Sequence, residues 1–434
     1  MIVYFLAALA FATGAAGQTA LTLDDAIARA RANNPDAAAS AAAERESNYR
    51  LSQAKAGYWP TVDLVESWQR GNQPVFVFGS LLTQRQFTAA DLRLEALNHP
   101  DAVDNFRSAL SLEQPLFAAG TRATVAAARI DHDLAGTARN VVSADLAVAV
   151  THAYGGVVLA AGARRSAAAA VERALADRAL AVARRDAGLA TDADVLQVDV
   201  HVARTREQQI RADSDERIAR ARLNQLIGEP LGATFSLAPV PPIAAAEAAA
   251  ATTLESEALE KRPEVKAAAL REDLARAREA AARDAFLPQV SVQAGWEFNG
   301  GAWNSRAFSW VVGAVARVNL FRGLGDKARL AEAREAATRR AIERAGADTA
   351  ARLDVHTALA RLEAARATEA VGRDAVTQAR ESQRIVRDRY QAGLTDVSSL
   401  LRAAEALVQA ELQQLAAQVA IVNENAALTR ALGR

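Results

Sequence analysis

The spacing of proline is the feature that most constrains how this chain folds. The 434 residues contain 11 prolines, and none lies between Pro115 and Pro230 or after Pro288. Because proline breaks the interior of a helix, these two stretches are where long helices can form. Each is interrupted once, at Gly188 and at Gly393. We predict long helices over residues 120–187 and 325–391, followed by return helices over 192–227 and 396–432. At about 1.5 Å per residue, each long helix would extend roughly 100 Å.

The composition of these stretches favours close packing between helices. Apolar residues recur at three- and four-residue steps, as at Val171, Leu175, Ala179 and Val182, which is the pattern of coiled coils. Alanine supplies much of the 51% apolar content, and aromatic residues make up only 5%. Such a chain suits long helices in mutual contact better than a single globular core.

Charge and residue usage exclude several classes of function. Positive and negative side chains balance at 51 each, so there is no net electrostatic case for a nucleic-acid partner. The absence of cysteine excludes disulfides, thiolate metal sites and a lipid on an N-terminal cysteine. The sequence also lacks a Gly-rich phosphate loop or a nucleophile motif, and its five histidines are scattered. We therefore expect no cofactor, no metal and no enzymatic activity.

The apolar N-terminal segment is typical of a secretory signal. Residues 1–17 end in small residues, with Ala15 and Gly17 at the positions that a signal peptidase recognises. We predict a signal peptide over residues 1–17. No Lys or Arg precedes the apolar run, so an uncleaved anchor is the alternative. No later segment approaches the ~18 apolar residues of a membrane helix, so any further membrane crossing would use strands.

The two halves of the chain repeat the same landmarks. Pro35 and Pro60 match Pro263 and Pro288 with a shift of 228 residues. A constant shift of 205 residues then relates Gly120 to Gly325, Gly188 to Gly393, Leu196 to Leu401, and Gly228 to Gly433. An internal duplication accounts for this register. We predict a first repeat over residues 18–228, a linker over 229–253 and a second repeat over 254–434, each beginning with a helix.

The segments between the helices are predicted β-hairpins, over residues 61–117 and 289–321. Alternation is clear in Val290, Val292, Ala294 and Trp296, and it fits either a soluble hairpin or a barrel strand. The interval from Pro60 to Phe117 is 57 residues against 33 in the second copy. The connection within the first hairpin is therefore longer, and it is too long for a structureless turn. Since barrels need at least about eight strands and one chain supplies four, a barrel would require several copies.

Together these features resemble the TolC family of outer-membrane efflux proteins. The resemblance covers almost the whole mature chain and lies in the order and spacing of short motifs. The motifs are Asn33-Asn34-Pro35, Tyr58-Trp59-Pro60, Gln114-Pro115-Leu116-Phe117, Gly188-Leu189-Ala190-Thr191-Asp192, Leu223-Asn224-Gln225-Leu226-Ile227-Gly228 and Arg389-Tyr390-Gln391-Ala392-Gly393.

The resemblance implies an α+β membrane protein. It would be a homotrimer in the cell outer membrane, with a twelve-stranded β-barrel and a periplasmic α-barrel of coiled-coil hairpins. It would be a passive exit duct for efflux or secretion of drugs, metal ions, solvents or polypeptides. Its implied partners are a periplasmic adaptor (membrane fusion) protein, an inner-membrane pump or ABC transporter, and outer-membrane lipid. The rival hypothesis is a soluble periplasmic coiled-coil scaffold or adaptor.

The resemblance also assigns candidate site residues. The glycine turns would form the periplasmic tip and contact the adaptor; they comprise Gly188, Leu189, Ala190, Thr191, Gly393, Leu394 and Thr395. Asp194 and Tyr390 are gate candidates, with Ser399 and Arg402 at places where relatives commonly carry acidic rings. The plainer interpretation is that the glycines are helix C-caps and that Thr191, Asp192, Thr395 and Asp396 are N-caps or dipole partners. An Arg402–Asp194 pair is a further possibility.

Overall fold

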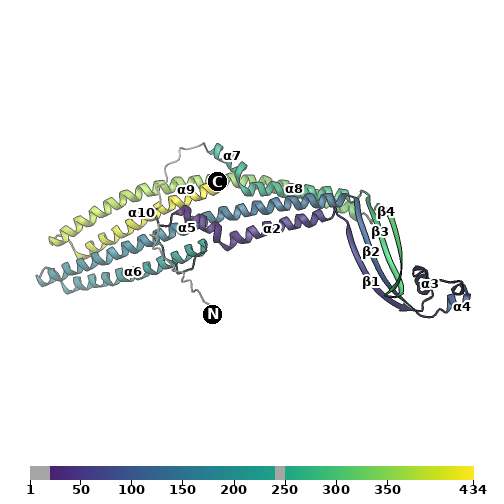
Figure 1. Ribbon diagram of the computed structural model, residues 1–434. Coiled ribbons are helices and arrows are strands. Elements are labelled where there is room, and N and C mark those ends of the chain that lie inside the picture. The colour runs from purple at the N-terminus through teal and green to yellow at the C-terminus, as the bar shows by residue number, and fades with distance from the viewer. Residues whose placement is uncertain (1–19, 240–249) are drawn as a thin grey trace, which may run out of the picture. The chain divides into compact units, whose positions relative to one another are not determined.

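The computed structural model describes residues 20–239 and 250–434. The predicted signal peptide lies outside the described residues, as do residues 240–249 of the predicted linker. Figure 1 shows the elements of the first repeat and of the second. The first repeat contains α1 (Leu23–Asn33), α2 (Pro35–Ala56), β1 (Thr61–Gly71), α3 (Pro74–Thr83), the 3-10 turn η1 (Ala89–Leu92), α4 (Leu94–Asn98), β2 (Val103–Ala118), α5 (Ala119–Asp186) and α6 (Asp192–Ile227). The second contains α7 (Ala251–Lys261), α8 (Pro263–Asp284), β3 (Gln289–Ala302), β4 (Ser305–Arg317), α9 (Gly325–Gln391) and α10 (Val397–Leu432).

The helices occur in pairs of matching length. The helices α1 and α7 have 11 residues each, α2 and α8 have 22, and α6 and α10 have 36. The long helices α5 and α9 have 68 and 67 residues. Among the described helices, α3, η1 and α4 have no counterpart in the second repeat, because β3 and β4 are joined directly by a tight turn.

The expectation that no segment after residues 1–17 is apolar enough for a membrane helix was wrong. Among the described helices, α5 is long and apolar enough in one 18-residue window to cross a membrane by composition alone. In that window, 44% of the residues are buried inside the chain. The core packing of Leu146, Val150 and Tyr154 of α5 explains this apolar character, because a buried helix passes the same test as a membrane span.

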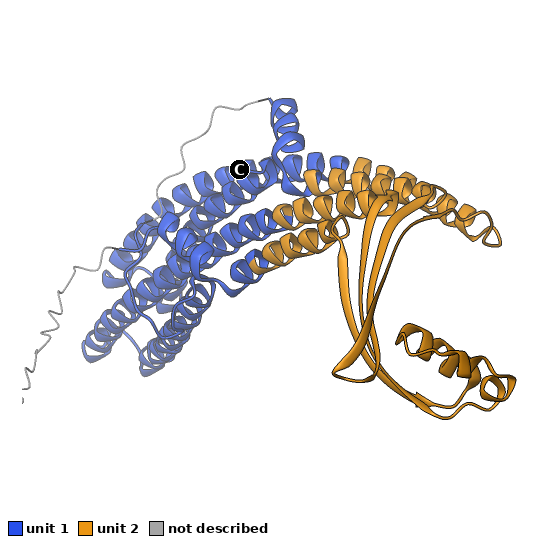
Figure 2. Ribbon diagram, turned by 45° about the vertical axis from the view of Figure 1, so that its right-hand side comes forward, with its two compact units in different colours: residues 1–41, 138–265, 348–434 blue, residues 42–137, 266–347 orange. Residues whose placement is uncertain are grey.

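The chain forms two compact units, drawn in different colours in Figure 2. Unit 1 comprises residues 1–41, 138–265 and 348–434. Its two matching cores combine α1 with α5 and α6, around Tyr154 and Ile227, and α7 with α9 and α10, around Val355 and Leu432. A third core joins α5, α6, α9 and α10 next to the helical turns.

Unit 2 comprises residues 42–137 and 266–347 and contains an antiparallel sheet of order β1-β2-β3-β4. The two predicted hairpins therefore form one sheet, since β2 of the first repeat pairs with β3 of the second. The second hairpin ends at Arg317 rather than Phe321. The register shifts at Pro115 in β2, where proline has no N–H to donate to the neighbouring strand.

The pairing register divides the sheet into an apolar face and a mixed, polar face. The apolar face carries Leu64 and Trp68 on β1, Phe106 and Leu110 on β2, Trp296 on β3 and Trp310 on β4. The polar face carries Asp63 and Gln69 on β1, Asn105 and Arg107 on β2, and Glu297 and Asn299 on β3. This alternation is that of barrel strands, which face lipid on one side and water on the other.

Candidate functional site: the paired helical turns

The two helix-to-helix turns of unit 1 have the same backbone geometry. Gly188 has φ +74° and Gly393 has φ +77°, in the left-handed region that glycine adopts without a Cβ penalty. The N–H of Gly188 donates to the Arg185 carbonyl and that of Leu189 to the Arg184 carbonyl, each at 2.8 Å. These two bonds form a Schellman motif, which satisfies the last carbonyls of α5.

The second turn repeats this arrangement at the end of α9. The N–H of Gly393 donates to the Tyr390 carbonyl at 3.1 Å, and that of Leu394 donates to the Arg389 carbonyl at 2.8 Å. The left-handed conformation therefore favours glycine at both turns, as the helix C-cap interpretation expected.

Each return helix has its own N-cap. Thr191 and Asp194 form a capping box at α6: the Thr191 hydroxyl accepts from the Asp194 N–H at 3.2 Å, and the Asp194 carboxylate accepts from the Thr191 N–H at 2.8 Å. At α10 the Asp396 carboxylate accepts from the Ser399 N–H at 2.7 Å. Hydrogen bonds from the Ser399 side chain and from this N–H hold the pKa of Asp396 below its usual value. Asp194, a gate candidate, thus also caps a helix, and Asp396 rather than Thr395 is the N-cap of α10.

The turns present apolar side chains to solvent at equivalent places. Leu189 and Leu394 are each 68% exposed, whereas Ala190 and Thr395 are half-buried. An identical exposed leucine therefore follows each glycine of the two turns.

Arg184 joins the two turns, and the sequence analysis did not single it out. Its guanidinium donates to the Leu189 carbonyl at 3.2 Å and to the Gln391 carbonyl at 3.4 Å, and it also donates to the Tyr390 carbonyl. Its central carbon lies 4.6 Å from the centre of the Tyr390 ring, a cation–π contact. One sequence signal pointed to it, because the 205-residue shift pairs Arg184 with a second arginine, Arg389.

Tyr390 lies inside the third core, next to the helical turns, rather than on the surface. It is 3% exposed and packs with Val195, Val397 and Leu400. Its buried hydroxyl finds no hydrogen-bond partner among the described residues. Burial raises the pKa of Tyr390 above its ordinary value, an effect that Arg184 opposes. The phenol is therefore neutral at physiological pH.

Ser399 and Arg402 lie together on the first turns of α10. The Arg402 guanidinium donates to the Ser399 hydroxyl at 3.1 Å, and Arg402 is exposed. Within the described part of a single chain, no ion pair joins Arg402 to Asp194.

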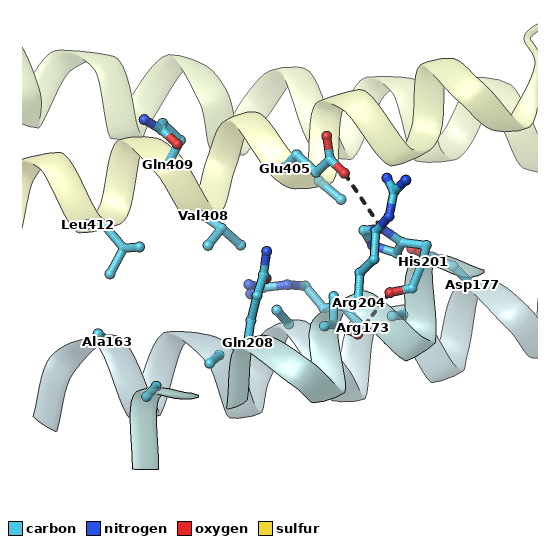
Figure 3. A pocket seen from close by; sticks show the side chains of 16 residues that line it. Ala163, Arg173, Asp177, His201, Arg204, Gln208, Glu405, Val408, Gln409 and Leu412 are labelled. Carbon is cyan, nitrogen blue, oxygen red and sulfur yellow. Dashed lines mark hydrogen bonds and ion pairs between the residues drawn. The ribbon is translucent and has the colours of Figure 1, made fainter. Parts of the chain in front are cut away.

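A cavity of about 560 Å³ lies between α5, α6 and α10, away from the turns. Figure 3 shows Asp177, His201 and Glu405 at one end of it, with the His201 Nδ1 3.7 Å from the Glu405 Oε1. Asp177 is 1% exposed and pairs with Arg387 of α9 at 3.3 Å. Burial raises the pKa of Asp177 and lowers that of His201. Sequence reasoning missed this cluster, since its members come from four helices.

No group of three or more acidic or histidine side chains that could hold a metal occurs in residues 20–239 and 250–434. The chemistry of the turns is thus that of apolar contact, hydrogen bonding and fixed charge.

Comparison with known proteins identifies relatives across nearly the whole chain. The family model for outer membrane efflux proteins matches residues 26–229 and 254–434. Protein CyaE of Bordetella pertussis is 29% identical over 311 residues, which span 70% of this chain and 65% of that protein. The alignment thus covers slightly less than two thirds of CyaE.

Solved structures share the fold at lower identity. The Campylobacter jejuni CmeC outer membrane channel has a TM-score of 0.81 at 14% identity, with 95% of this chain and 85% of that chain covered. VceC from Vibrio cholerae has a TM-score of 0.79 at 19% identity, with 95% and 96% covered. Because the family model matches both repeats, the chain belongs to the outer membrane efflux protein family, as the resemblance to TolC proteins implied.

Proposed function

We propose that this chain is one subunit of a trimeric exit duct that docks on a periplasmic adaptor through its paired turns. An inner-membrane pump or ABC transporter would supply the energy, since the channel family itself is not enzymatic.

The observation that carries the proposal is the pairing of Leu189 and Leu394. Each follows a left-handed glycine, and each is 68% exposed. Large apolar side chains at two equivalent exposed positions are typical of contact residues. In a trimer the pair would occur three times around the tip, which suits a partner that binds in several copies.

Site-specific cross-linking tests the docking role. The chain has no cysteine, so Leu189→Cys and Leu394→Cys each introduce a single thiol for a photoactivatable cross-linker. We expect both variants to capture the same periplasmic protein in cells. The control is Leu231→Cys, at a residue 63% exposed but outside the turns, which should not capture it. Capture by the control alone, or by none of the three, would refute docking at the turns.

A soluble periplasmic scaffold is the weaker candidate. It would leave the apolar face of the sheet in water, and Trp68 and Trp310 on that face are 60% and 66% exposed in the single chain. Lipid covers such a face in a barrel, and membership in a channel family favours that arrangement.

We propose further that Asp194, Tyr390, Ser399 and Arg402 set the gate at the tip. Asp194 is tied to its capping box, whereas Arg402 is exposed. A ring of exposed arginines favours anions at a constriction, because charged rings select ions of opposite sign. Arg402→Asp should therefore shift the reversal potential of the purified channel in planar bilayers toward cation preference. The exposed Arg211→Asp on α6 should not. Equal selectivity in wild type and Arg402→Asp would remove Arg402 from the gate.

A further inference from the structure

The segment between β1 and β2 has no counterpart in the second repeat. Residues 72–102, which include α3, η1 and α4, join β1 to β2, whereas residues 303–304 suffice between β3 and β4. Within unit 2 this segment lies at the ends of the strands remote from the helices (Figure 2). Because the helices of the family extend into the periplasm, these strand ends face the outside of the cell.

Hydrogen bonds attach the segment to the polar face of the sheet. The Gln84 side-chain amide, at the end of α3, donates to the Asp104 carbonyl at 2.8 Å and to the Asn105 Oδ1 at 3.0 Å. Asn105 donates to Asn299 at 3.1 Å, and Asn299 donates to Glu297 at 3.2 Å. Gln84, Asn105 and Asn299 are 6%, 7% and 1% exposed. A connected, buried polar network of this kind fixes one position for the segment.

The attachment reaches from β2 across to β4. The Arg85 guanidinium donates to the Phe308 carbonyl of β4 at 2.9 Å, and an atom added at Gly71 would lie 3.5 Å from the Phe76 ring. The face that receives α3 is the polar one, opposite to the face that carries Trp68, Trp296 and Trp310. In a membrane barrel the tryptophan-bearing face is the lipid side, so α3 lies on the lumen side.

The outward side of α3 is nevertheless apolar. Val77 and Ser80 are buried against the sheet, whereas Val75, Phe78 and Leu82 are 85%, 39% and 48% exposed. Their spacing of three and four residues places these three on one stripe of the helix. Lipid cannot cover this stripe, because it is on the lumen side of the sheet. Within its own segment the Phe78 ring meets the edge of Phe87, with 4.9 Å between the ring centres, yet the stripe stays exposed. Further apolar surface within reach in the mouth of a trimeric barrel is the same segment of the neighbouring copies, which also exposes Leu92 and Leu94.

We propose that residues 74–98 form a lid across the outward mouth of the barrel, in which the stripe of Val75, Phe78 and Leu82 packs against the stripes of the two other subunits. Gln84 anchors the lid to its own sheet, and the apolar contact between copies closes it. This inference rests on the trimeric barrel. It adds a second barrier, on the cell exterior, to the constriction at the helical turns.

Cysteine chemistry on the intact trimer tests the lid. A single Leu82→Cys variant should form a disulfide-linked dimer under mild oxidation in outer membranes. Arg93→Cys, in the same segment but outside the stripe, should not. If trimers persist while Leu82→Cys stays unlinked, the lid is refuted and the channel assignment stands. If no trimer forms at all, the failure belongs to the channel assignment.

A second measurement does not depend on the cross-link. Ser111→Cys places a thiol on the exposed polar face of β2, below the proposed lid. Phe78→Asp with Leu82→Asp should speed its labelling by a bulky, membrane-impermeant maleimide several-fold in whole cells. Arg93→Ala should leave the labelling rate unchanged. Equal rates in all three backgrounds would show that residues 74–98 do not close the mouth.

Discussion

Arg184 is the side chain on which the geometry of the two turns most depends. It bonds carbonyls of both turns and stacks on Tyr390. A charge-assisted hydrogen bond contributes about 1.5–3 kcal/mol, although solvent reduces that value at a half-exposed site. The two turns share this one guanidinium, so its loss should separate them.

Replacement of Arg184 by alanine should loosen the tip. We expect faster cleavage of residues 187–192 and 391–396 by a protease under native conditions, because the turns lose their common anchor. Arg211→Ala removes only an exposed i,i+4 ion pair with Glu207. The protease should cleave this variant as slowly as it cleaves the wild type. If the protease cleaves the two turns of Arg184→Ala as slowly as those of the wild type, the Arg184 contacts do not hold the turns together.

Substitution of Gly188 or Gly393 by valine should impair export without abolishing trimers. A left-handed conformation costs a residue with a Cβ roughly 1–2 kcal/mol, and more if it is β-branched, so the turn would rearrange. The matched control is Gly346→Ala within α9, where an added Cβ meets nothing within 4 Å. Export assays and heat-modifiable migration in gels measure the two properties. Normal export by both valine variants would argue against a role of the turns in docking or gating.

At the scale of elements, we expect the packing of α6 against α5 and α10 to depend on pH. His201 is buried on α6, facing Asp177 of α5 and Glu405 of α10, with Arg204 on its own helix. Burial lowers the pKa of His201 below its ordinary 6.5, although both carboxylates oppose the shift. His201 therefore takes up a proton more readily in the unfolded chain than in the folded chain.

The sign of the pH effect follows from this shift. The contribution of His201 to stability is complete above pH 6.5 and is lost as the pH falls through the lowered pKa of the folded state. Asp177 acts oppositely: its pKa is raised by burial, so its contribution is complete below its ordinary 3.8 and is lost as the pH rises through the raised pKa of the folded state. Comparison with a His201 variant that keeps Asp177 isolates the part of the histidine. Wild type should therefore lose melting temperature between pH 7 and pH 5, and His201→Gln should lose less. His356→Gln, at an exposed site on α9, is the control. Parallel losses in all three proteins would exclude His201 as the source.

The long helices and the turns were predictable from sequence because their causes are local. Proline spacing limits where α5 and α9 can run, and the glycines that stop them differ from their neighbours in backbone freedom. The strands were predictable from alternation, but their union into one sheet was not. The pairing of β2 with β3 joins residues about 190 positions apart, as in the Arg107–Glu297 bond.

The details of the site depended on tertiary placement. Arg184 and the Tyr390 carbonyl are separated by 206 positions, and His201 meets Glu405 only because α6 packs near α10. No local pattern distinguishes these residues from the many other charged residues on the helices. The extra length between β1 and β2 was visible in the sequence. Its position on the polar face of the sheet is set by hydrogen bonds of Gln84 and Asn105, and no periodic pattern predicts these bonds.

At the scale of the whole molecule, the sheet has two unpaired edges. The strands β1 and β4 are the outer members of the sheet order, and open strand edges are not tolerated in lipid. The chain belongs to the outer membrane efflux protein family, which implies a trimeric channel, and we therefore propose that β1 of one copy pairs with β4 of the next. Closure by identical copies is the central claim on which the channel, the lid and the ring of turns all depend.

Cross-linking between the two edges tests that claim most directly. Cysteine pairs placed along β1 and β4, such as Leu64→Cys with Val312→Cys on the apolar face, can link only neighbouring copies, because β2 and β3 separate the two strands within one chain. Oxidation in outer membranes should give a covalent ladder that ends at three chains for at least one register, and either single variant should give none. A protein that stays monomeric in every register, or a ladder that continues beyond three chains, would contradict a barrel closed by three copies.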